Sequence, residues 1–260
     1  MKLYHYTSVK NFKKIWESKS LKFSDSKKTN DIFEKRKMIQ VYSVTFPKEY
    51  EPNSKGFPFI KHFFDILFGY RQISLCMDYG QDLKGYASPM MWGQYANSSK
   101  GVCIELDSDK LDLDNSHIWS DKVDYLEQVR EIVFDNCVFQ NDNDINRFIE
   151  ERISDIFFKK HYHWKNENEY RIISNKEEFL SIKDAITAIY VPKDTGYAFR
   201  VVDKMIEGSN VKFRYLVPTI SKGGRKLSCM DVETARRCQR QFEEKKTYTT
   251  KEILGLNDID

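Results

Sequence analysis

The sequence KLYHYTSVKNFKKIWESKSLKF, residues 2–23, contains signals for both strands and a helix. Lys2–Tyr6 is predicted to be a strand. Thr7 or Ser8 can cap the helix that follows, because a side-chain oxygen there accepts a hydrogen bond from a free amide of the first helical turn. Four apolar residues then recur at helical spacing: Val9, Phe12, Ile15 and Trp16. Leu21–Phe23 is again extended, so the chain opens as strand, helix and strand.

The rest of the chain continues this mixture. Ser88-Pro89 is typical of a helix start. The longest amphipathic helix is predicted from Ile145 to Phe157, capped by Asn143 or Asp144. Further strands are expected at 102–106, 169–173, 187–191 and 211–217. The irregular alternation predicts an α+β fold, with a bent, mainly antiparallel split sheet flanked by helices and with strands 2–6 and 169–173 central.

The 260 residues are expected to form one α+β core domain over residues 1–218 and an appendage over residues 219–260. Pro218–Gly224 has the composition of a linker, and Asp231–Lys246 is predicted to be a charged helix. Two stretches are basic: residues 1–40 hold eleven Lys and Arg against four Asp and Glu, and residues 221–240 hold six against two. These stretches are either solvated faces or phosphate-binding surfaces.

Charge, cysteine spacing and the N-terminus limit the environment and the partners that we expect for this protein. The net charge of +3 does not by itself indicate nucleic-acid binding. The five cysteines show no CxxC spacing, which fits reduced thiols, and the N-terminus lacks the apolar core of a signal peptide. His161 and His163 have no third metal ligand at a diagnostic distance. We therefore expect a soluble, cytoplasmic protein without a metal.

Four segments concentrate aromatic and polar residues at the ends of predicted elements. They are LYHYTS (3–8), TNDIFE (29–34), MWGQYA (91–96) with GVCIE (101–105), and WKNENEYRI (164–172). In this order they resemble a bacterial family of domains of unknown function, DUF2971, over about residues 2–217. This resemblance implies a family but little biochemistry.

A second resemblance is to the ADP-ribosyltransferase superfamily. That family opens with a strand carrying His or Arg, then presents an aromatic residue that stacks on nicotinamide and a late strand with a catalytic Glu. His5, Tyr95 and Glu167 or Glu169 occur in that order. The spacing of Tyr86 and Tyr95 departs from the paired-tyrosine pattern of the diphtheria-toxin branch, which leaves the stacking residue open.

This second resemblance implies an NAD-dependent ADP-ribosyltransferase or NAD-cleaving domain, such as a bacterial toxin or phage-defence effector. Glu169 would be the catalytic carboxylate that stabilises the oxocarbenium ion, and Glu167 its helper. The residues expected to bind NAD are His5, Tyr6, Thr7, Trp92, Tyr95 and Arg171. The acceptor of the ADP-ribose would be a nucleic acid or a protein.

Each of these residues also has a structural interpretation. His5 could be an ordinary strand histidine, and Trp92 and Tyr95 could be core residues. Glu169 and Arg171 have the same parity on a strand and could form a structural ion pair. The alternative function is a non-enzymatic module that binds nucleic acid or protein through its basic patches. A hydrolase of another phosphorylated nucleotide is a third possibility.

Overall fold

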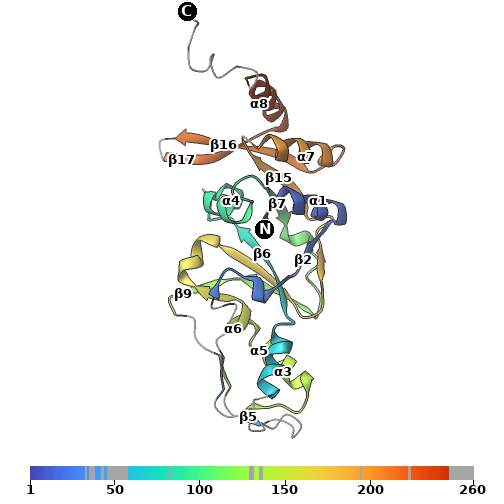
Figure 1. Cartoon of the computed structure of the whole chain (residues 1–260), viewed down its shortest axis with the longest axis vertical. Helices are drawn as coiled ribbons and strands as arrows, with labels where there is room; N and C mark the ends of the chain where they lie inside the picture. Colours follow the sequence, from blue (N-terminus) through green and yellow to red (C-terminus); the bar gives the residue numbers. More distant parts are fainter. Residues whose placement is uncertain are drawn as a thin grey trace, which may run out of the picture. The chain divides into compact units, whose positions relative to one another are not determined.

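The computed structural model describes most of the chain: residues 1–32, 34, 39–41, 44–45, 58–81, 83–128, 132–134, 137–193, 195–221 and 224–245. These form two compact units, each assembled from separate stretches of sequence (Figure 1). Unit 1 comprises Met1–His5, Glu17–Gly85 and Asp107–Ala185. Unit 2 comprises Tyr6–Trp16, Tyr86–Leu106 and Ile186–Asp260.

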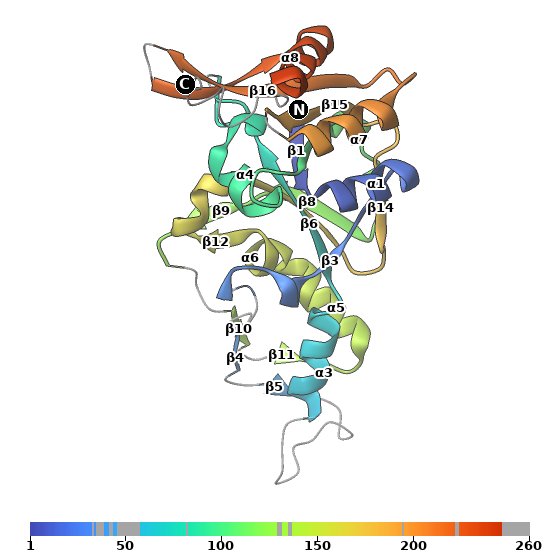
Figure 2. The same ribbon diagram turned by 45° about the horizontal axis from the view of Figure 1, so that its top comes forward.

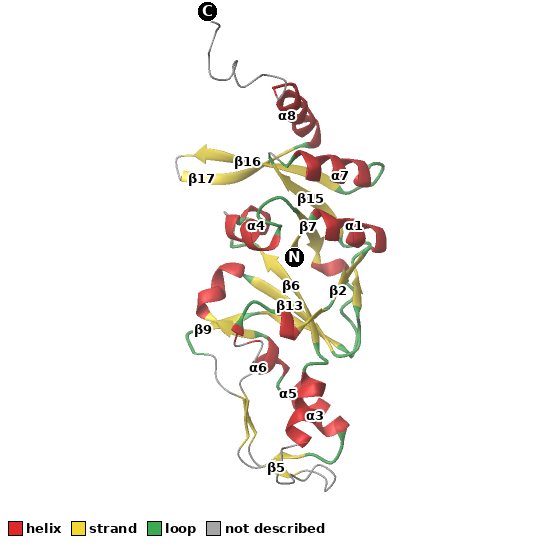
Figure 3. Ribbon diagram, viewed as in Figure 1, coloured by secondary structure: helices red, strands yellow, loops and turns green. Residues whose placement is uncertain are grey.

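The α+β class is confirmed. Helices and strands occur in both units, and the strands pair in a mixed, largely antiparallel pattern (Figure 3). In unit 1 the strand order is β1 (Lys2–Thr7), β6 (Arg71–Met77), β13 (Glu169–Ser174) and β8 (Ile118–Lys122), and β3 (Ser24–Asp25) also pairs with β6. The strand predicted over 169–173 is thus interior, with β6 and β8 antiparallel on its two sides.

Shorter strands complete unit 1. β2 (Ser20–Lys22) and β14 (Phe179–Ser181) are antiparallel. Three other pairs are parallel: β9 (Asp124–Leu126) with β12 (Lys159–His161), β4 (Ile39–Val41) with β10 (Ile132–Phe134), and β5 (Val44–Thr45) with β11 (Cys137–Val138). Short 3-10 helices among the described residues are η1 (Ser26–Lys28), η3 (Gly85–Ala87), η4 (Ser108–Lys110) and η5 (Tyr162–Glu167).

An aromatic core holds the helices of unit 1. α3 (Pro58–Leu67) lies beside α5 (Asp142–Glu151) in Figure 2, with the Phe63 and Phe148 rings 6.2 Å apart. The predicted long helix is interrupted: Arg152 has φ −116°, and α6 (Ile153–Phe157) begins after it. The predicted cap was also wrong. Asn141 caps α5, because its side chain accepts from the amides of Asn143 and Asp144.

Unit 2 contains the strand order β7 (Val102–Asp107), β15 (Ile186–Pro192), β16 (Lys212–Ser221) and β17 (Gly224–Met230). Its helices are α1 (Val9–Ser18), α4 (Pro89–Tyr95), α7 (Gly196–Ile206) and α8 (Val232–Lys245). The parallel strands β15 and β16 are joined by α7, and Ser88 caps α4 as predicted.

The end of the core strand differs from the sequence prediction. β16 continues through Pro218 to Ser221 and pairs with β17 along its last seven residues. The expected linker at Pro218–Gly224 is therefore partly strand, with residues 222 and 223 outside the described part of the chain. The expected domain boundary at residue 218 falls inside β16.

Within the described residues, every helix is too short or too polar to cross a lipid bilayer.

Candidate functional site

Unit 1 contains a buried cluster of five charged side chains: Glu34, Lys160, Glu167, Glu169 and Arg171. Arg171 is fully buried. Its Nε lies 2.7 Å from Glu169 Oε1, and its Nη2 lies 2.8 Å from Glu169 Oε2 and 2.5 Å from Glu34 Oε1. Lys160 Nζ lies 2.6 Å from Glu167 Oε2 and 3.3 Å from Glu169 Oε2. The Glu169–Arg171 ion pair anticipated from strand parity is therefore present.

Local backbone geometry brings the two predicted catalytic glutamates together. β13 begins at Glu169, so Glu167 lies not on the strand but at the end of η5. Between them Asn168 has φ 44° and ψ 56°, a left-handed conformation that asparagine tolerates better than most residues. Its side chain donates to the Asp78 carbonyl at 2.9 Å, which fixes this turn. Glu167 and Glu169 consequently share Lys160 as a partner.

The charges in this cluster control its titration. Burial alone would raise the pKa of Glu169, but the charge and hydrogen bonds of Arg171 and the charge of Lys160 outweigh it and hold that pKa at about 2. Burial lowers the pKa of Lys160, but the carboxylates, Glu169 foremost, raise it overall. Glu169 is only 3% exposed and both of its oxygens accept hydrogen bonds, so it remains an ionised ion-pair partner without an open face for a substrate.

The other predicted site residues are divided between the units. His5 is in unit 1, where burial lowers its pKa to about 4 against the opposing effect of a hydrogen bond with the Ser74 backbone. Tyr6, Thr7 and Trp92 are buried in unit 2. Tyr6 meets Trp92 edge to face, with ring centroids 5.1 Å apart, as core aromatic residues do.

Tyr95 and Tyr86 also lie in unit 2, where Tyr95 is half-buried on α4. The indole N–H of Trp92 donates to the backbone carbonyl of Tyr86 at 2.7 Å. The Tyr86 ring stacks on the ring of Tyr190, with centroids 4.2 Å apart. Tyr190 in turn donates its hydroxyl to Glu105 at 2.6 Å. Tyr86 thus already has an aromatic partner within the protein.

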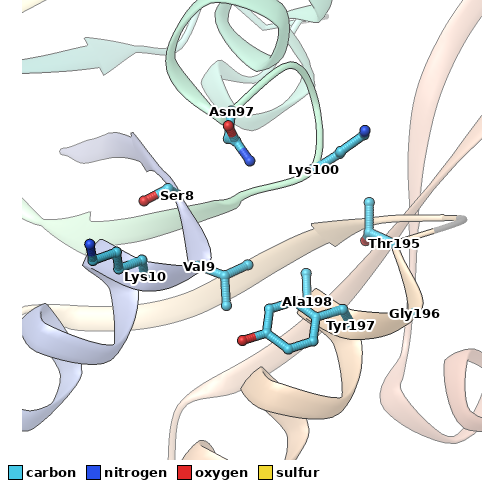
Figure 4. Close-up of a pocket in the computed structure, with 9 residues that line it drawn as sticks. All are labelled: Ser8, Val9, Lys10, Asn97, Lys100, Thr195, Gly196, Tyr197 and Ala198. Atoms are coloured by element: carbon cyan, nitrogen blue, oxygen red, sulfur yellow. The ribbon is translucent and has the colours of Figure 1, made fainter.

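Unit 2 contains a pocket of about 620 Å³ where three segments meet (Figure 4). The first segment starts α1, the second follows α4, and the third starts α7. The lining residues are Ser8, Val9, Lys10, Asn97, Lys100, Thr195, Gly196, Tyr197 and Ala198. In Figure 4 the Asn97 amide points into the space between these segments, and Lys10 and Lys100 lie on opposite sides of it.

A close backbone approach sets the position of the middle segment. Asn97, Ser98 and Ser99 have φ values of 50°, 54° and 65°, so this turn is left-handed throughout. A Cβ on Gly101 would lie 2.1 Å from the Thr7 carbonyl oxygen, which no real side chain permits. Glycine at 101 therefore lets the chain return against the end of β1, beside the start of α1.

The two helix starts in the pocket are capped differently. Ser8 Oγ accepts from the Asn11 amide at 3.2 Å and so caps α1. Thr195, at the corresponding position of α7, instead donates its hydroxyl to the Pro192 carbonyl at 2.5 Å. The first amides of α7, starting at Gly196, therefore receive no side-chain cap. They form the positive end of the α7 dipole at the wall of the pocket.

The described charged groups in the lining are of one sign. Two of the nine lining residues that the structure describes are lysines, and none of these nine is a carboxylate. Within the described part of the chain, no ion pair is recorded for the ammonium group of Lys10 or Lys100. Tyr197 is 61% exposed and contributes an aromatic face, whereas Val9 and Ala198 are buried and apolar. This combination of an aromatic face, hydroxyls and free positive charge suits an anion attached to a ring system.

The motifs singled out in the sequence lie next to this pocket but include few of its lining residues. LYHYTS ends at Ser8, and MWGQYA ends at Ala96, one residue before Asn97. Thr195 and Tyr197 belong to no quoted motif. The signal that could have found them is the start of a helix soon after the strand expected at 187–191. Among residues the structure describes, no group of three His, Cys, Asp or Glu side chains could hold a metal ion.

No curated protein and no solved structure matches this chain. The resemblance to ADP-ribosyltransferases therefore receives no support from these comparisons. A family model does match residues 91–172, a range that includes the MWGQYA and WKNENEYRI segments and η5. Over this range, which contains the last two of the four motifs, the chain is similar to the family described as "Protein of unknown function (DUF2971)". The predicted resemblance is thus supported for residues 91–172 of the expected range 2–217.

Proposed function

We propose that this chain binds a nucleotide with a pyrophosphate group in the pocket of unit 2, and that NAD is the first ligand to test. The observation that carries this proposal is the uncapped start of α7 together with Lys10 and Lys100, which have no ion-pair partner among the described residues, in a pocket whose described lining contains no carboxylate. Helix amides and ammonium groups are the usual partners of phosphate oxygens.

The size and remaining chemistry of the pocket support a nucleotide over a free phosphate. A volume of about 620 Å³ lies within the usual range for organic ligands and far exceeds that of a single anion. Tyr197 offers a ring face for a base or nicotinamide, and Asn97 an amide for its polar edge. The choice of NAD among nucleotides rests on the resemblance of LYHYTS and the later motifs to ADP-ribosyltransferases.

The geometry supports binding of NAD more than its cleavage by the expected carboxylate. Cleavage of the nicotinamide–ribose bond requires a carboxylate beside the developing oxocarbenium ion. Glu169 is held in the buried cluster by Arg171 and Lys160, and Glu167 is held by Lys160. ADP-ribosyl transfer therefore remains a proposal that needs its own assay, separate from binding.

Calorimetric titration of the full chain with NAD, ADP-ribose, AMP and nicotinamide mononucleotide tests binding. The double variant Lys10→Ala/Lys100→Ala removes both ammonium groups. Loss of each exposed phosphate contact should weaken affinity roughly three- to tenfold. Lys14→Ala/Lys204→Ala, which removes two exposed lysines outside the pocket lining, is the matched control.

The four ligands and the two double variants together decide the proposal. NAD and ADP-ribose should bind more tightly than AMP, and only the pocket variant should lose affinity. Absence of binding by all four ligands, or equal weakening in both double variants, would refute it. Release of nicotinamide by the wild-type protein would add cleavage to binding, and binding without release would assign the chain a non-enzymatic role.

A further inference from the structure

Beyond the core of unit 2, the hairpin of β16 and β17 continues as an exposed ribbon. Tyr215, Leu216 and Val217 are buried, but Pro218 is exposed, and Ile220 is 85% exposed. On β17, Gly224, Arg225 and Lys226 are all exposed. We name the outer part, Pro218–Ser221 with Gly224–Leu227, the β-arm; its two strands run side by side in Figure 1.

The β-arm lies in a segment with charge of a single sign. Residues 208–230 contain five cations and no Asp or Glu: Lys212, Arg214, Lys222, Arg225 and Lys226. No ion pair is recorded for Arg225 or Lys226 within the part of the chain that the structure describes. The helix that follows adds Arg237 and Arg240, both exposed, while Arg236 is held by Asp203 at 2.9 Å. The arm therefore projects uncompensated positive charge.

Strand register gives the two faces of the β-arm different chemistry. Ile220 is directly opposite Arg225, and Pro218 is opposite Leu227, so these four side chains share one face. Thr219 and Lys226 are opposite one another on the other face, where the Thr219 and Ser228 hydroxyls are 2.8 Å apart. One face is thus apolar with an arginine, and the other is polar with a lysine.

We propose that the β-arm binds duplex DNA by entering a groove, with Arg225 and Lys226 on phosphates and Ile220 as an apolar wedge against a base step. A two-stranded ribbon can enter either groove of B-form DNA, and proteins that bend DNA from the minor groove use Ile, Leu and Pro as wedges between base steps. An exposed isoleucine alone needs no explanation. Here it is opposite an arginine near the end of a carboxylate-free ribbon, which favours a polyanion with stacked apolar bases.

Two other occupants fit the β-arm less well. A second copy of this chain would bring two sets of Arg225 and Lys226 together, and like charges repel. An acidic protein would satisfy the cations but offers no stacked bases to Ile220. The proposal therefore commits to the duplex, and an acidic polypeptide serves as the competing ligand in the test.

Fluorescence anisotropy of a labelled 20-base-pair duplex, between 50 and 200 mM salt, measures the binding. Arg225→Ala/Lys226→Ala should lose at least tenfold in affinity at the lowest salt. The slope of log K against log salt concentration should also become shallower by about 2, because two phosphate contacts disappear. Lys14→Ala/Lys204→Ala removes the same charge elsewhere in unit 2 and should change neither quantity appreciably.

Ile220→Ser tests the wedge without altering charge. Wild-type protein should raise energy transfer between dyes at the two ends of the duplex by bending it, and this variant should bind without doing so. Bending equal to wild type would overturn the wedge. Any of three results would overturn the groove proposal. They are absence of duplex binding at 50 mM salt, equal effects of the two double variants, and binding of polyglutamate as tight as that of the duplex. The affinity of the same variants for NAD should stay unchanged, so the outcome for DNA binding is distinguishable from the outcome for the pocket.

Discussion

Glu169→Gln should destabilise unit 1 by about 3 kcal/mol at neutral pH. The pKa of Glu169 falls from 4.5 to about 2 on folding, and such a change corresponds to about 3 kcal/mol of interaction with the charged form. Glutamine keeps the shape but loses the charge, and its amide N–H2 would face the donors of Arg171 or Lys160. Removal of one partner from a buried ion pair typically costs about 3–5 kcal/mol, in agreement with this magnitude.

Thermal unfolding followed by far-UV circular dichroism at pH 7 measures the effect. At about 2–4 °C per kcal/mol for a chain of this size, the melting temperature should fall by roughly 6–12 °C. Glu178→Gln is the matched control. Glu178 accepts from Arg71 at 2.8 Å, but both side chains are exposed, so this variant should melt close to wild type.

The pH dependence supplies an independent check. Because folding lowers the pKa of Glu169, its contribution is complete above pH 4.5 and is lost as the pH falls from there towards about 2. The difference between wild type and Glu169→Gln should therefore narrow below pH 4.5. If Glu169→Gln melts within about 2 °C of Glu178→Gln at pH 7, the cluster does not stabilise the fold. Loss of nicotinamide release at an unchanged melting temperature would instead favour a catalytic carboxylate.

Two further predictions concern backbone packing and the half-buried His5. Wild-type stability should decrease as the pH falls from 6.5 to about 4, because His5 takes up a proton in the unfolded chain but not in the folded one; His5→Gln should remove this part of the slope in urea unfolding. Gly101→Ala should lower the melting temperature by several degrees, since its Cβ would lie 2.1 Å from the Thr7 oxygen. Gly93→Ala, with nothing within 4 Å of its Cβ, should stabilise α4 by about 0.5–1 kcal/mol. The reverse order of these two glycine variants would contradict the packing described for the pocket.

Local signals in the sequence were sufficient for several elements. Ser88-Pro89 predicted the start of α4, because cap and first-turn preferences depend only on neighbouring residues. Strand parity placed Glu169 and Arg171 on one face of β13, because side chains alternate along any strand. The MWGQYA and WKNENEYRI motifs likewise predicted the family that residues 91–172 match.

Other features depended on contacts between distant residues. Glu34 meets Arg171 across 137 positions of sequence, and no local pattern specifies that pairing. The pocket combines three chain segments whose convergence requires the close approach at Gly101. The composition of Pro218–Gly224 also suggested a linker, and proline lacks the N–H of a ladder hydrogen bond. β16 nevertheless continues through Pro218, because its pairing with β15 ends at Leu216 and only β17 accompanies it farther. A proline is tolerated where a strand has one neighbour, and the number of neighbours is set by tertiary structure.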